Sequence, residues 1–298
     1  MAERAWRGEL RRDEPMAAHV SWRAGGAAAR AYFPADLDDL ALFLQDMRHD
    51  EPLLFVGLGS NLLVRDGGFD GTVVFTHAAL GQMQFEPDAL IYAEAGVPSP
   101  KLARYAASQG LVGAEFLAGI PGSLGGALAM NAGCYGGETW QHVQKVLMLN
   151  RYGERVERDA GDFHVAYRHV GLHAACDEWF VAAWLAFAPG DGAEARERMR
   201  VLLDKRGLSQ PLNLPNAGSV FRNPPGDHAA RLVEAAGLKA YSIGGARVSE
   251  KHTNFIVNPD SAATASEIEM LIDHVHACVQ QKFGVDLQRE VRIVGEKA

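Results

Sequence analysis

The chain has 298 residues, 48% of them hydrophobic, which is long and apolar enough for two domains with buried cores. Its 29 basic and 37 acidic residues give a formal charge of −8 without any long basic run, so we expect neither a nucleic-acid nor a membrane partner. Three widely spaced cysteines, Cys134, Cys176 and Cys278, argue against a disulfide framework and suit a reducing cytoplasm.

The first two thirds of the chain are rich in short β-type runs. Residues 1–16 are charged and lack the apolar stretch of a secretory signal, so we interpret them as a polar leader on a cytosolic protein. The run at 179–188 is about half the roughly 20 residues needed to cross a bilayer, so it is predicted to be a buried strand. Strands are predicted at residues 52–57, 72–76, 90–95, 143–150 and 179–188.

Helical patterns interrupt and follow these strands. A helix is predicted at residues 99–109, with Leu102 and Tyr105 on its apolar stripe and Gly110 at its C-terminal cap. After a linker at residues 189–192, a highly charged helix is predicted at 193–206, and we place the domain boundary at this linker.

The last hundred residues alternate between helix and strand. A helix is predicted at residues 229–236 and strands at 255–258 and 290–294. Between them, Thr264 and Glu267 have capping-box spacing ahead of a long apolar-faced helix that ends before Gly284. The pattern predicts an α+β protein with sheets of mixed strand direction.

The first candidate binding loop follows the strand at residues 52–57. Its sequence is Gly57-Leu58-Gly59-Ser60-Asn61-Leu62, which lacks the third glycine of a Rossmann fingerprint. Small residues in succession still allow backbone N–H groups to form a concave nest for an anion. A tight turn between strands is an equally good interpretation of this loop alone.

A second loop is richer in glycine, with seven glycines between residues 119 and 137. So much backbone freedom is costly to order, which indicates close approach to a group such as a pyrophosphate. No P-loop sequence is present, so a P-loop nucleotidase is not expected. The remaining interpretation of the loop is a site for a dinucleotide held by backbone amides. The candidate binding residues in this loop are Gly119, Pro121, Gly122, Ser123, Gly125, Gly126, Asn131 and Gly133.

These two loops carry a resemblance to a known family. The sequence GLGSNLLVRDGGFDG from Gly57, followed by GIPGSLGGALAMNAGCYG from Gly119, resembles the UDP-N-acetylenolpyruvoylglucosamine reductases of peptidoglycan precursor synthesis. The resemblance covers nearly the whole chain. It includes SWRAGG from Ser21, NAGSVFRNP from Asn216, GLK from Gly237 and VSEKHTNF from Val248, all in the order of the family.

The resemblance implies a fold, a cofactor and a reaction. The fold is a two-lobed FAD-binding module of the vanillyl-alcohol-oxidase (PCMH) type followed by a smaller α+β substrate-binding domain, in the shorter structural type of the family. FAD is bound non-covalently, and NADPH is the hydride donor for reducing the enolpyruvyl group of UDP-N-acetylglucosamine-enolpyruvate to a lactyl ether. The expected layout is a leader at 1–16, the FAD-binding domain at 17–190, a connecting helix at 191–206 and the carboxy-terminal domain at 207–298.

The family match also assigns three catalytic residues. Arg168 would grip the substrate carboxylate through parallel N–H bonds, although taken alone it reads as a surface arginine at a strand end. Glu290 would polarise the same carboxylate, although an ion pair is the simpler interpretation from spacing. Ser219 would donate a proton to carbon, although by itself it reads as a turn or cap residue.

Two further residues match the substrate-binding positions of the family. Asn223 should contact the sugar nucleotide, and Lys239 is a weaker candidate for its diphosphate. The chain departs from the family at His169-Val170, where an acidic residue and a serine are usual, and at Arg222, where lysine is commoner. The first departure puts the local support of Arg168 in question.

Alternatives to this interpretation stay open at the sequence level. His164, His169, His173 and Cys176 lack the paired spacing of zinc sites, so we expect no metal. Cys134 is expected to be a small packed residue and not a covalent flavin tether. The rival functions are a flavin oxidase on the same fold and a non-catalytic nucleotide-sugar or flavin-binding module. We expect a cytoplasmic monomer.

Overall fold

The computed structural model describes residues 6–77, 79–173 and 176–298. The chain divides into two compact units, each built from several segments. Unit 1 contains the residues up to Arg11, then Ala31–Leu58 and Thr72–Lys205. Unit 2 contains Arg12–Arg30, Gly59–Gly71 and Arg206–Ala298.

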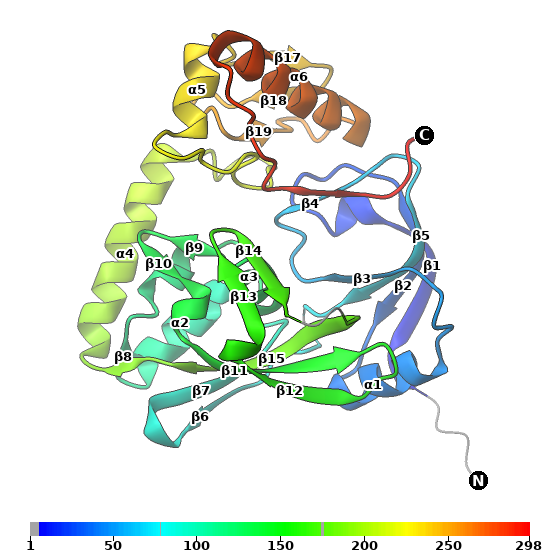
Figure 1. Ribbon diagram of the computed structural model, residues 1–298, viewed down its shortest axis with the longest axis vertical. Coiled ribbons are helices and arrows are strands. Elements are labelled where there is room, and N and C mark those ends of the chain that lie inside the picture. The colour runs from blue at the N-terminus through cyan, green and yellow to red at the C-terminus, as the bar shows by residue number, and fades with distance from the viewer. Residues whose placement is uncertain (1–5, 78, 174–175) are drawn as a thin grey trace. The chain divides into compact units, whose positions relative to one another are not determined.

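The main sheet of unit 1 is antiparallel, with the strand order β12-β11-β15-β7-β6 (Figure 1). The predicted strands at 90–95, 143–150 and 179–188 are present as β7, β11 and β15. The strand bounds are β6 Met83–Glu86, β7 Leu90–Glu94, β11 Val143–Asn150, β12 Arg155–Asp159 and β15 Glu178–Ala186.

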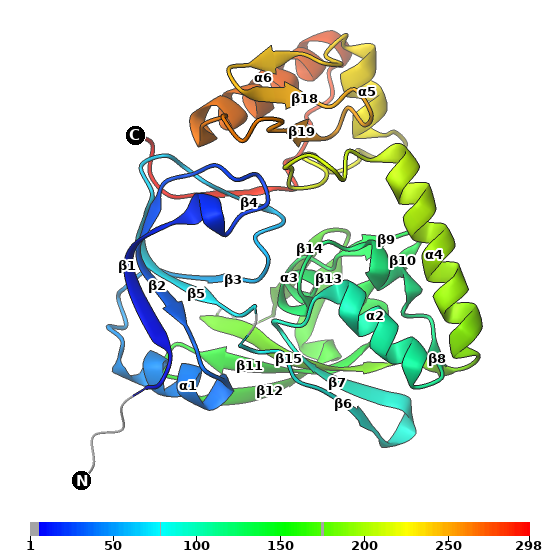
Figure 2. The same cartoon turned by 180° about the vertical axis from the view of Figure 1, so that it is seen from behind.

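Two helices of unit 1 cover one face of this sheet, as both views show (Figures 1 and 2). Helix α2, Ser99–Ser108, confirms the predicted helix, and Gly110 follows its end with a left-handed φ of +71°. Helix α3, Leu124–Ala129, begins directly after Ser123 of the second glycine-rich loop. Leu102, Leu124 and Leu128 are buried in the core that joins these helices to the sheet.

A second, four-stranded sheet has the order β1-β2-β5-β3. Strand β3, Leu53–Val56, pairs in parallel with β5, Phe69–Phe75, and the two correspond to the predicted strands at 52–57 and 72–76. Strand β1, Glu9–Pro15, lies inside the predicted polar leader and is mostly exposed, which is why its sequence looks like a solvated segment. Strand β2, Ala27–Phe33, and helix α1, Leu37–Asp46, had no sequence prediction.

Short hairpins and turns complete unit 1. Strand β8, Leu111–Val112, pairs with β16, Ala188–Pro189, and β9, Gly133–Cys134, pairs with β10, Gly137–Glu138. Strand β13, Phe163–Ala166, pairs with β14, His169–Leu172. The 3-10 turns of unit 1 in the described chain are Pro87–Ala89, Glu115–Gly119, Thr139–Gln141 and Ala160–Asp162, and a further one, Met16–Ala18, lies in unit 2.

Helix α4, Gly192–Ser209, is the charged helix predicted at 193–206. Most of its residues are exposed, and Ala195 and Met199 are its buried residues. Within residues 6–77, 79–173 and 176–298, the helices are all too short or too polar to cross a bilayer.

Unit 2 packs two helices against a small antiparallel sheet. The sheet order is β17-β18-β19, with Ser242–Ile243, Ala246–Val248 and Ile256–Val257 as strands. Helix α5 spans Ala229–Ala235 and α6 spans Ala265–Phe283 (Figure 2). The predicted capping box of Thr264 and Glu267 is present, and Gly284 ends α6 with a φ of +69°.

The earlier segments of the chain are integral parts of unit 2. Trp22 is fully buried in the unit 2 core and donates from Nε1 to the carbonyl of Ile256 at 2.8 Å. Asp66 accepts from the backbone N–H groups of Ala265 and Ser266 at the start of α6. Strand β4, Leu62–Val64, pairs in parallel with the final strand β20, Arg292–Val294, which begins two residues later than predicted.

Candidate active site

The first glycine-rich loop begins in unit 1 where β3 ends. A Cβ atom at Gly57 would lie 2.0 Å from Ser123 Oγ, so the two predicted loops meet there and a side chain at position 57 is excluded. Ser123 is 2% exposed, and its hydroxyl has no hydrogen-bond partner among the described residues. A buried hydroxyl without a partner is a reason to expect a bound polar group.

The second loop runs across unit 1 from Gly119 to Gly126. Packing explains two of its glycines, since a Cβ at Gly119 would lie 2.6 Å from Cys134 Sγ and one at Gly125 would lie 2.9 Å from Ala95 Cβ. Gly126 has open space beside it, because a Cβ there would meet no described atom within 4 Å. Pro121 is exposed, and the carbonyl of Gly122 accepts from Ser99 N at 2.9 Å. The loop therefore offers close-packed backbone beside an unpartnered hydroxyl, which fits a phosphate-bearing cofactor such as FAD.

The rest of the first loop belongs to unit 2. Gly59 has a φ of +59°, and a Cβ there would lie 2.1 Å from the carbonyl of His19. Asn61 donates from Nδ2 to the carbonyl of Glu290 at 3.1 Å, and Leu62 begins β4. Ser60, between them, is half-buried. The two halves of this loop are therefore held by different units.

Arg168 occupies the two-residue turn between β13 and β14. Its φ of +54° is left-handed, and its guanidinium donates to the carbonyls of Asn131 at 3.2 Å and Gly133 at 2.8 Å. The guanidinium carbon also lies 4.9 Å from the centre of the Tyr167 ring. Backbone carbonyls of the glycine-rich loop thus support Arg168, and the neighbouring His169 is exposed.

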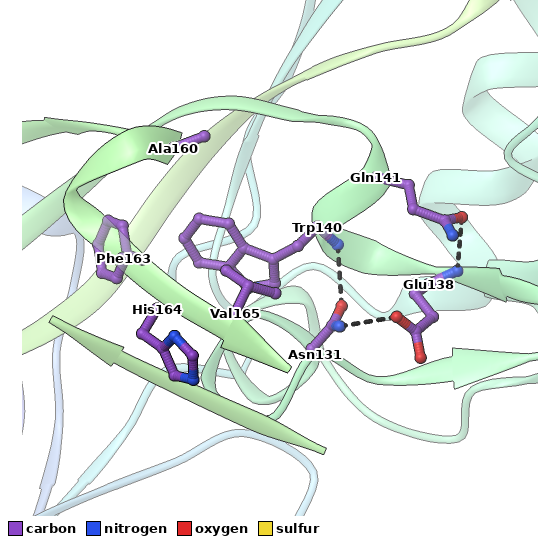
Figure 3. Close-up of a pocket in the computed structure, with 8 residues that line it drawn as sticks. All are labelled: Asn131, Glu138, Trp140, Gln141, Ala160, Phe163, His164 and Val165. Carbon is purple, nitrogen blue, oxygen red and sulfur yellow. Dashed lines mark hydrogen bonds between the residues drawn. The ribbon is translucent and has the colours of Figure 1, made fainter. Parts of the chain in front are cut away.

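Asn131 lies at the rim of a cavity of about 510 Å³ beside this hairpin (Figure 3). Its side-chain nitrogen donates to Glu138 Oε2 at 2.9 Å and to the carbonyl of Ala166 at 3.3 Å, and its oxygen accepts from Trp140 N at 3.1 Å. The side chain of Asn131 is therefore engaged within unit 1. The residues around the cavity are Asn131, Glu138, Trp140, Gln141, Ala160, Phe163, His164 and Val165.

Ser219 and Glu290 lie on neighbouring extended segments of unit 2. Glu290 N donates to the carbonyl of Val220 at 2.8 Å, and Phe221 forms an antiparallel bridge with Arg289. Both Ser219 and Glu290 are half-buried. Gly218, with a φ of +76°, turns the chain immediately before Ser219. Backbone pairing thus brings the predicted proton donor and the predicted carboxylate into one region of unit 2.

The two predicted substrate-binding residues are both exposed. Asn223 accepts through Oδ1 from Ala229 N at 3.0 Å and so caps α5. Lys239 donates to Glu234 Oε1 at 3.1 Å in a solvent-exposed ion pair. Neither contact excludes a ligand, because the Lys239 pair is weak and a cap leaves the amide nitrogen of Asn223 for another partner.

Two polar groups near these segments had no sequence prediction as site residues. Arg222 Nε and His252 Nδ1 are buried without a hydrogen-bond partner among the described residues. Burial lowers the pKa of His252, so its ring is neutral at pH 7. Both residues lie in the motifs that carry the family resemblance, but their sequence alone gives no sign of unsatisfied buried atoms.

The histidine and cysteine residues form no metal centre that the structure describes. The His164 and His169 rings lie 5.9 Å apart across the β13–β14 hairpin, and Cys176 is exposed. Among the described residues, no group of three or more His, Cys, Asp or Glu side chains is placed to hold a metal. None of the three cysteines forms a disulfide, and Cys134 packs against Gly119 as expected of a small packed residue.

Comparison with known proteins first defines the class. A family model described as "FAD binding domain" matches residues 28–158, and one described as "UDP-N-acetylenolpyruvoylglucosamine reductase, C-terminal domain" matches residues 210–294. The chain is therefore an FAD-containing oxidoreductase, as the sequence predicted. Its carboxy-terminal domain is of the type found in UDP-N-acetylenolpyruvoylglucosamine reductases.

Similarity to individual proteins then gives the family. The chain is 54% identical to the UDP-N-acetylenolpyruvoylglucosamine reductase of Thiobacillus denitrificans, covering 98% of this chain and 94% of that one. It is 56% identical to the reductase of Methylococcus capsulatus, covering 97% and 94%. The chain belongs to the UDP-N-acetylenolpyruvoylglucosamine reductase family.

A solved structure agrees with this assignment. The crystal structure of the UDP-N-acetylenolpyruvylglucosamine reductase from Thermus caldophilus matches with a TM-score of 0.81 at 28% identity, covering 96% of this chain and 98% of that one. The predicted fold class, an FAD-binding module followed by an α+β domain, is confirmed. The two rival functions, a flavin oxidase and a non-catalytic module, are not favoured.

Proposed function

We propose that the chain reduces the enolpyruvyl group of UDP-N-acetylglucosamine-enolpyruvate to the lactyl ether of UDP-N-acetylmuramate, with NADPH as the hydride donor. The observation that carries this proposal is the pairing of the Ser219 and Glu290 segments inside the domain that matches the family model. A hydride and a proton add across the substrate double bond, and NADPH is oxidised to NADP⁺. FAD, when bound, supplies the hydride chemistry.

Cofactor binding is assigned to the two glycine-rich loops. Ser123 supplies an unpartnered buried hydroxyl, and Gly57 and Gly126 keep the surrounding backbone free of side chains. Backbone amides in such loops bind phosphate oxygens without using charged residues. The proposed residues are Gly57, Gly59, Ser60, Asn61, Leu62, Gly119, Pro121, Gly122, Ser123, Gly125, Gly126 and Gly133.

Arg168 and Glu290 are proposed to stabilise the substrate carboxylate. Negative charge accumulates there when hydride adds to the neighbouring double bond, and a guanidinium can hold two carboxylate oxygens at once. Arg168 donates to the carbonyls of Asn131 and Gly133, and its hydrogen bonds to a carboxylate would be stronger than these two. Glu290, in its protonated form, is proposed to donate a hydrogen bond to this carboxylate.

Ser219 is proposed to donate its Oγ proton to the substrate carbon. A serine hydroxyl is a weak acid, so it needs a strongly basic acceptor and a fixed position. The backbone bonds on either side of Val220 provide that fixed position. Asn223 and Lys239 are proposed to bind the sugar nucleotide, and the enzyme is proposed to act as a cytoplasmic monomer.

The test is the visible absorption spectrum of the purified protein, recorded before and after two additions. NADPH should bleach the flavin bands, and the enolpyruvyl nucleotide should then restore them in stoichiometric amount. Loss of the bands with NADPH followed by recovery only with oxygen would instead indicate an oxidase. Added FAD should also raise the melting temperature, since a ligand in hundredfold excess over its dissociation constant contributes about 2.7 kcal/mol.

A further inference from the structure

We propose that Asn131 and Glu138 are positioning residues for Arg168 and act through its guanidinium, not by contacting cofactor or substrate. The inference rests on the proposed function in one respect only, which is the role of Arg168 in binding the substrate carboxylate. It concerns Asn131, which was expected from the sequence to bind the cofactor, and Glu138, to which the sequence analysis assigned no role.

The side chain of Asn131 ties the glycine-rich loop to the hairpin that carries Arg168. It donates to the carbonyl of Ala166, the last residue of β13, at 3.3 Å. It also donates to Glu138 at 2.9 Å, a bond that Figure 3 draws. Its oxygen accepts from Trp140 N at 3.1 Å. Asn131 is 2% exposed, so its own side-chain atoms in these bonds are shielded from water.

The backbone of the same residue receives the guanidinium. Arg168 Nη1 donates to the carbonyl of Asn131 at 3.2 Å, and the direction of that carbonyl depends on the left-handed φ of +43° at Asn131. Asparagine adopts this conformation more readily than most residues, but it still needs support. The three side-chain bonds supply it.

Glu138 and Arg168 meet at Gly133. A Cβ atom at Gly133 would lie 2.9 Å from Glu138 Cγ and 3.2 Å from Arg168 Nη1, so both side chains occupy the space that a side chain there would need. Gly133 also accepts from Arg168 Nη2 at 2.8 Å through its carbonyl and pairs with Glu138 between β9 and β10. Glu138 thus holds Asn131 and adds negative charge near the guanidinium.

The first experiment compares Glu138→Ala with Glu138→Gln in the FAD-loaded protein. Loss of the bond from Asn131 to Glu138 Oε2 should slow flavin reoxidation by the enolpyruvyl nucleotide by about ten- to a hundredfold, because small misplacements of a binding group cost that much. Bleaching by NADPH should stay within about threefold. Glu138→Gln keeps an oxygen that accepts from Asn131 and should recover most of the rate.

A matched control exists in the same unit. Asn150 donates from Nδ2 to Glu154 Oε2 at 2.8 Å, and its oxygen accepts from the backbone N–H groups of Tyr152 and Glu154. This is the same Asn–Glu chemistry on the turn between β11 and β12, a different turn from the one that carries Arg168. Glu154→Ala should therefore leave both half-reactions unchanged.

The decisive measurement is a double-mutant cycle with Arg168→Ala. If Glu138 acts through Arg168, then Glu138→Ala should slow reoxidation no further once Arg168 is absent. If the double variant reoxidises more slowly than Arg168→Ala by the factor that Glu138→Ala alone causes, the proposal is overturned. It is also overturned if Glu138→Ala slows bleaching as much as reoxidation, or if that variant loses its flavin.

A second readout separates this inference from the proposed function. The Nε–H NMR signal of Arg168, assigned with Arg168→Lys, should shift or broaden in Glu138→Ala and stay in place in Glu154→Ala. If the unaltered protein fails to reduce the enolpyruvyl nucleotide, the proposed function is wrong while this signal still tests the positioning. An Arg168 signal unchanged by Glu138→Ala would refute the inference.

Discussion

Two of the three candidate catalytic side chains, Arg168 and Ser219, are held in place by different means. Arg168 in unit 1 is held by its own side chain, through hydrogen bonds to the carbonyls of Asn131 and Gly133. Ser219 in unit 2 is held by main chain, because its neighbour Val220 bonds to Asn254 and to Glu290 through backbone atoms. A proton donor must not move, but a guanidinium that binds a carboxylate must be able to release its resting partners.

The largest expected effect tests Ser219, the side chain that backbone hydrogen bonds hold in place. Ser219→Ala should slow flavin reoxidation by the enolpyruvyl nucleotide about a hundred- to ten-thousandfold, because a positioned acid is lost. Bleaching by NADPH should continue at nearly the normal rate, since it places no proton on a substrate carbon. Stopped-flow absorbance follows both steps. Ser219→Cys should recover part of the rate, and slow bleaching with normal reoxidation would show that Ser219 is not the donor.

The next largest effect tests Arg168, the side chain that must be able to exchange its hydrogen-bond partners, and Glu290. Arg168→Ala or Glu290→Gln should lower turnover about a hundred- to a thousandfold, with the loss confined to reoxidation, because the charge they stabilise forms only then. Arg155→Ala, which removes an exposed ion pair with Asp38, is the control and should leave turnover unchanged. Turnover within about threefold of the unaltered enzyme for either variant would remove that residue from the mechanism.

A smaller effect is expected on the free energy of unfolding when Asn254, which binds the backbone next to Ser219, is replaced. The buried side chain of Asn254 accepts from Phe221 N at 3.0 Å and donates to the carbonyl of Phe221 at 2.8 Å. Asn254→Ala leaves both groups without a partner and should lower the free energy of unfolding by about 1–3 kcal/mol for each. Urea denaturation measures this change. Full stability in the variant would show that the segment is held by its other backbone bonds.

The smallest effect is on the acid stability of unit 2. The hydrogen bonds from Arg65 lower the pKa of Glu269, whose carboxylate accepts from Arg65 at 2.8 and 2.9 Å. A carboxyl whose folded pKa is depressed contributes stability above its unfolded pKa of about 4.3, and this is lost as pH falls through the folded value.

The variant Glu269→Gln should therefore be less stable at pH 7 by about 1.5–3 kcal/mol, with a weaker decline of stability below about pH 4.3. Melting temperatures measured between about pH 3 and 7 give both slopes. Parallel curves for the two proteins would show that the Arg65–Glu269 pair contributes nothing to acid unfolding.

Sequence patterns predicted the parts of this protein that local chemistry determines. Helix α6 has its capping box at Thr264 and its left-handed glycine at Gly284, and both signals act within a few residues of the helix ends. Strand β1 was not predicted because its residues are mostly exposed and lack an apolar alternation. The β13–β14 hairpin was not predicted because its turn, Tyr167-Arg168, contains no glycine, asparagine or proline.

The candidate site was predictable as a set of motifs but not as an arrangement. The family motifs include Asn131 and Gly133 in the glycine-rich loop, which suggested cofactor contacts. That expectation stays a prediction, and the structure adds contacts with Arg168, whose sequence separation from Asn131 and Gly133 is 37 and 35 residues. Such contacts depend on the tertiary path of the chain, and no periodicity or cap signal in the sequence reports them.

The assembly of unit 2 from three chain segments has a consequence during synthesis. Trp22 and Leu63 are buried in the unit 2 core, but their partners Ile256, Leu271 and Val291 are made much later. At about 5–20 residues per second, the early segments wait for many seconds with their apolar side chains in water. The nascent chain of this protein should therefore depend on a chaperone during that interval, and slowing translation should increase its aggregation.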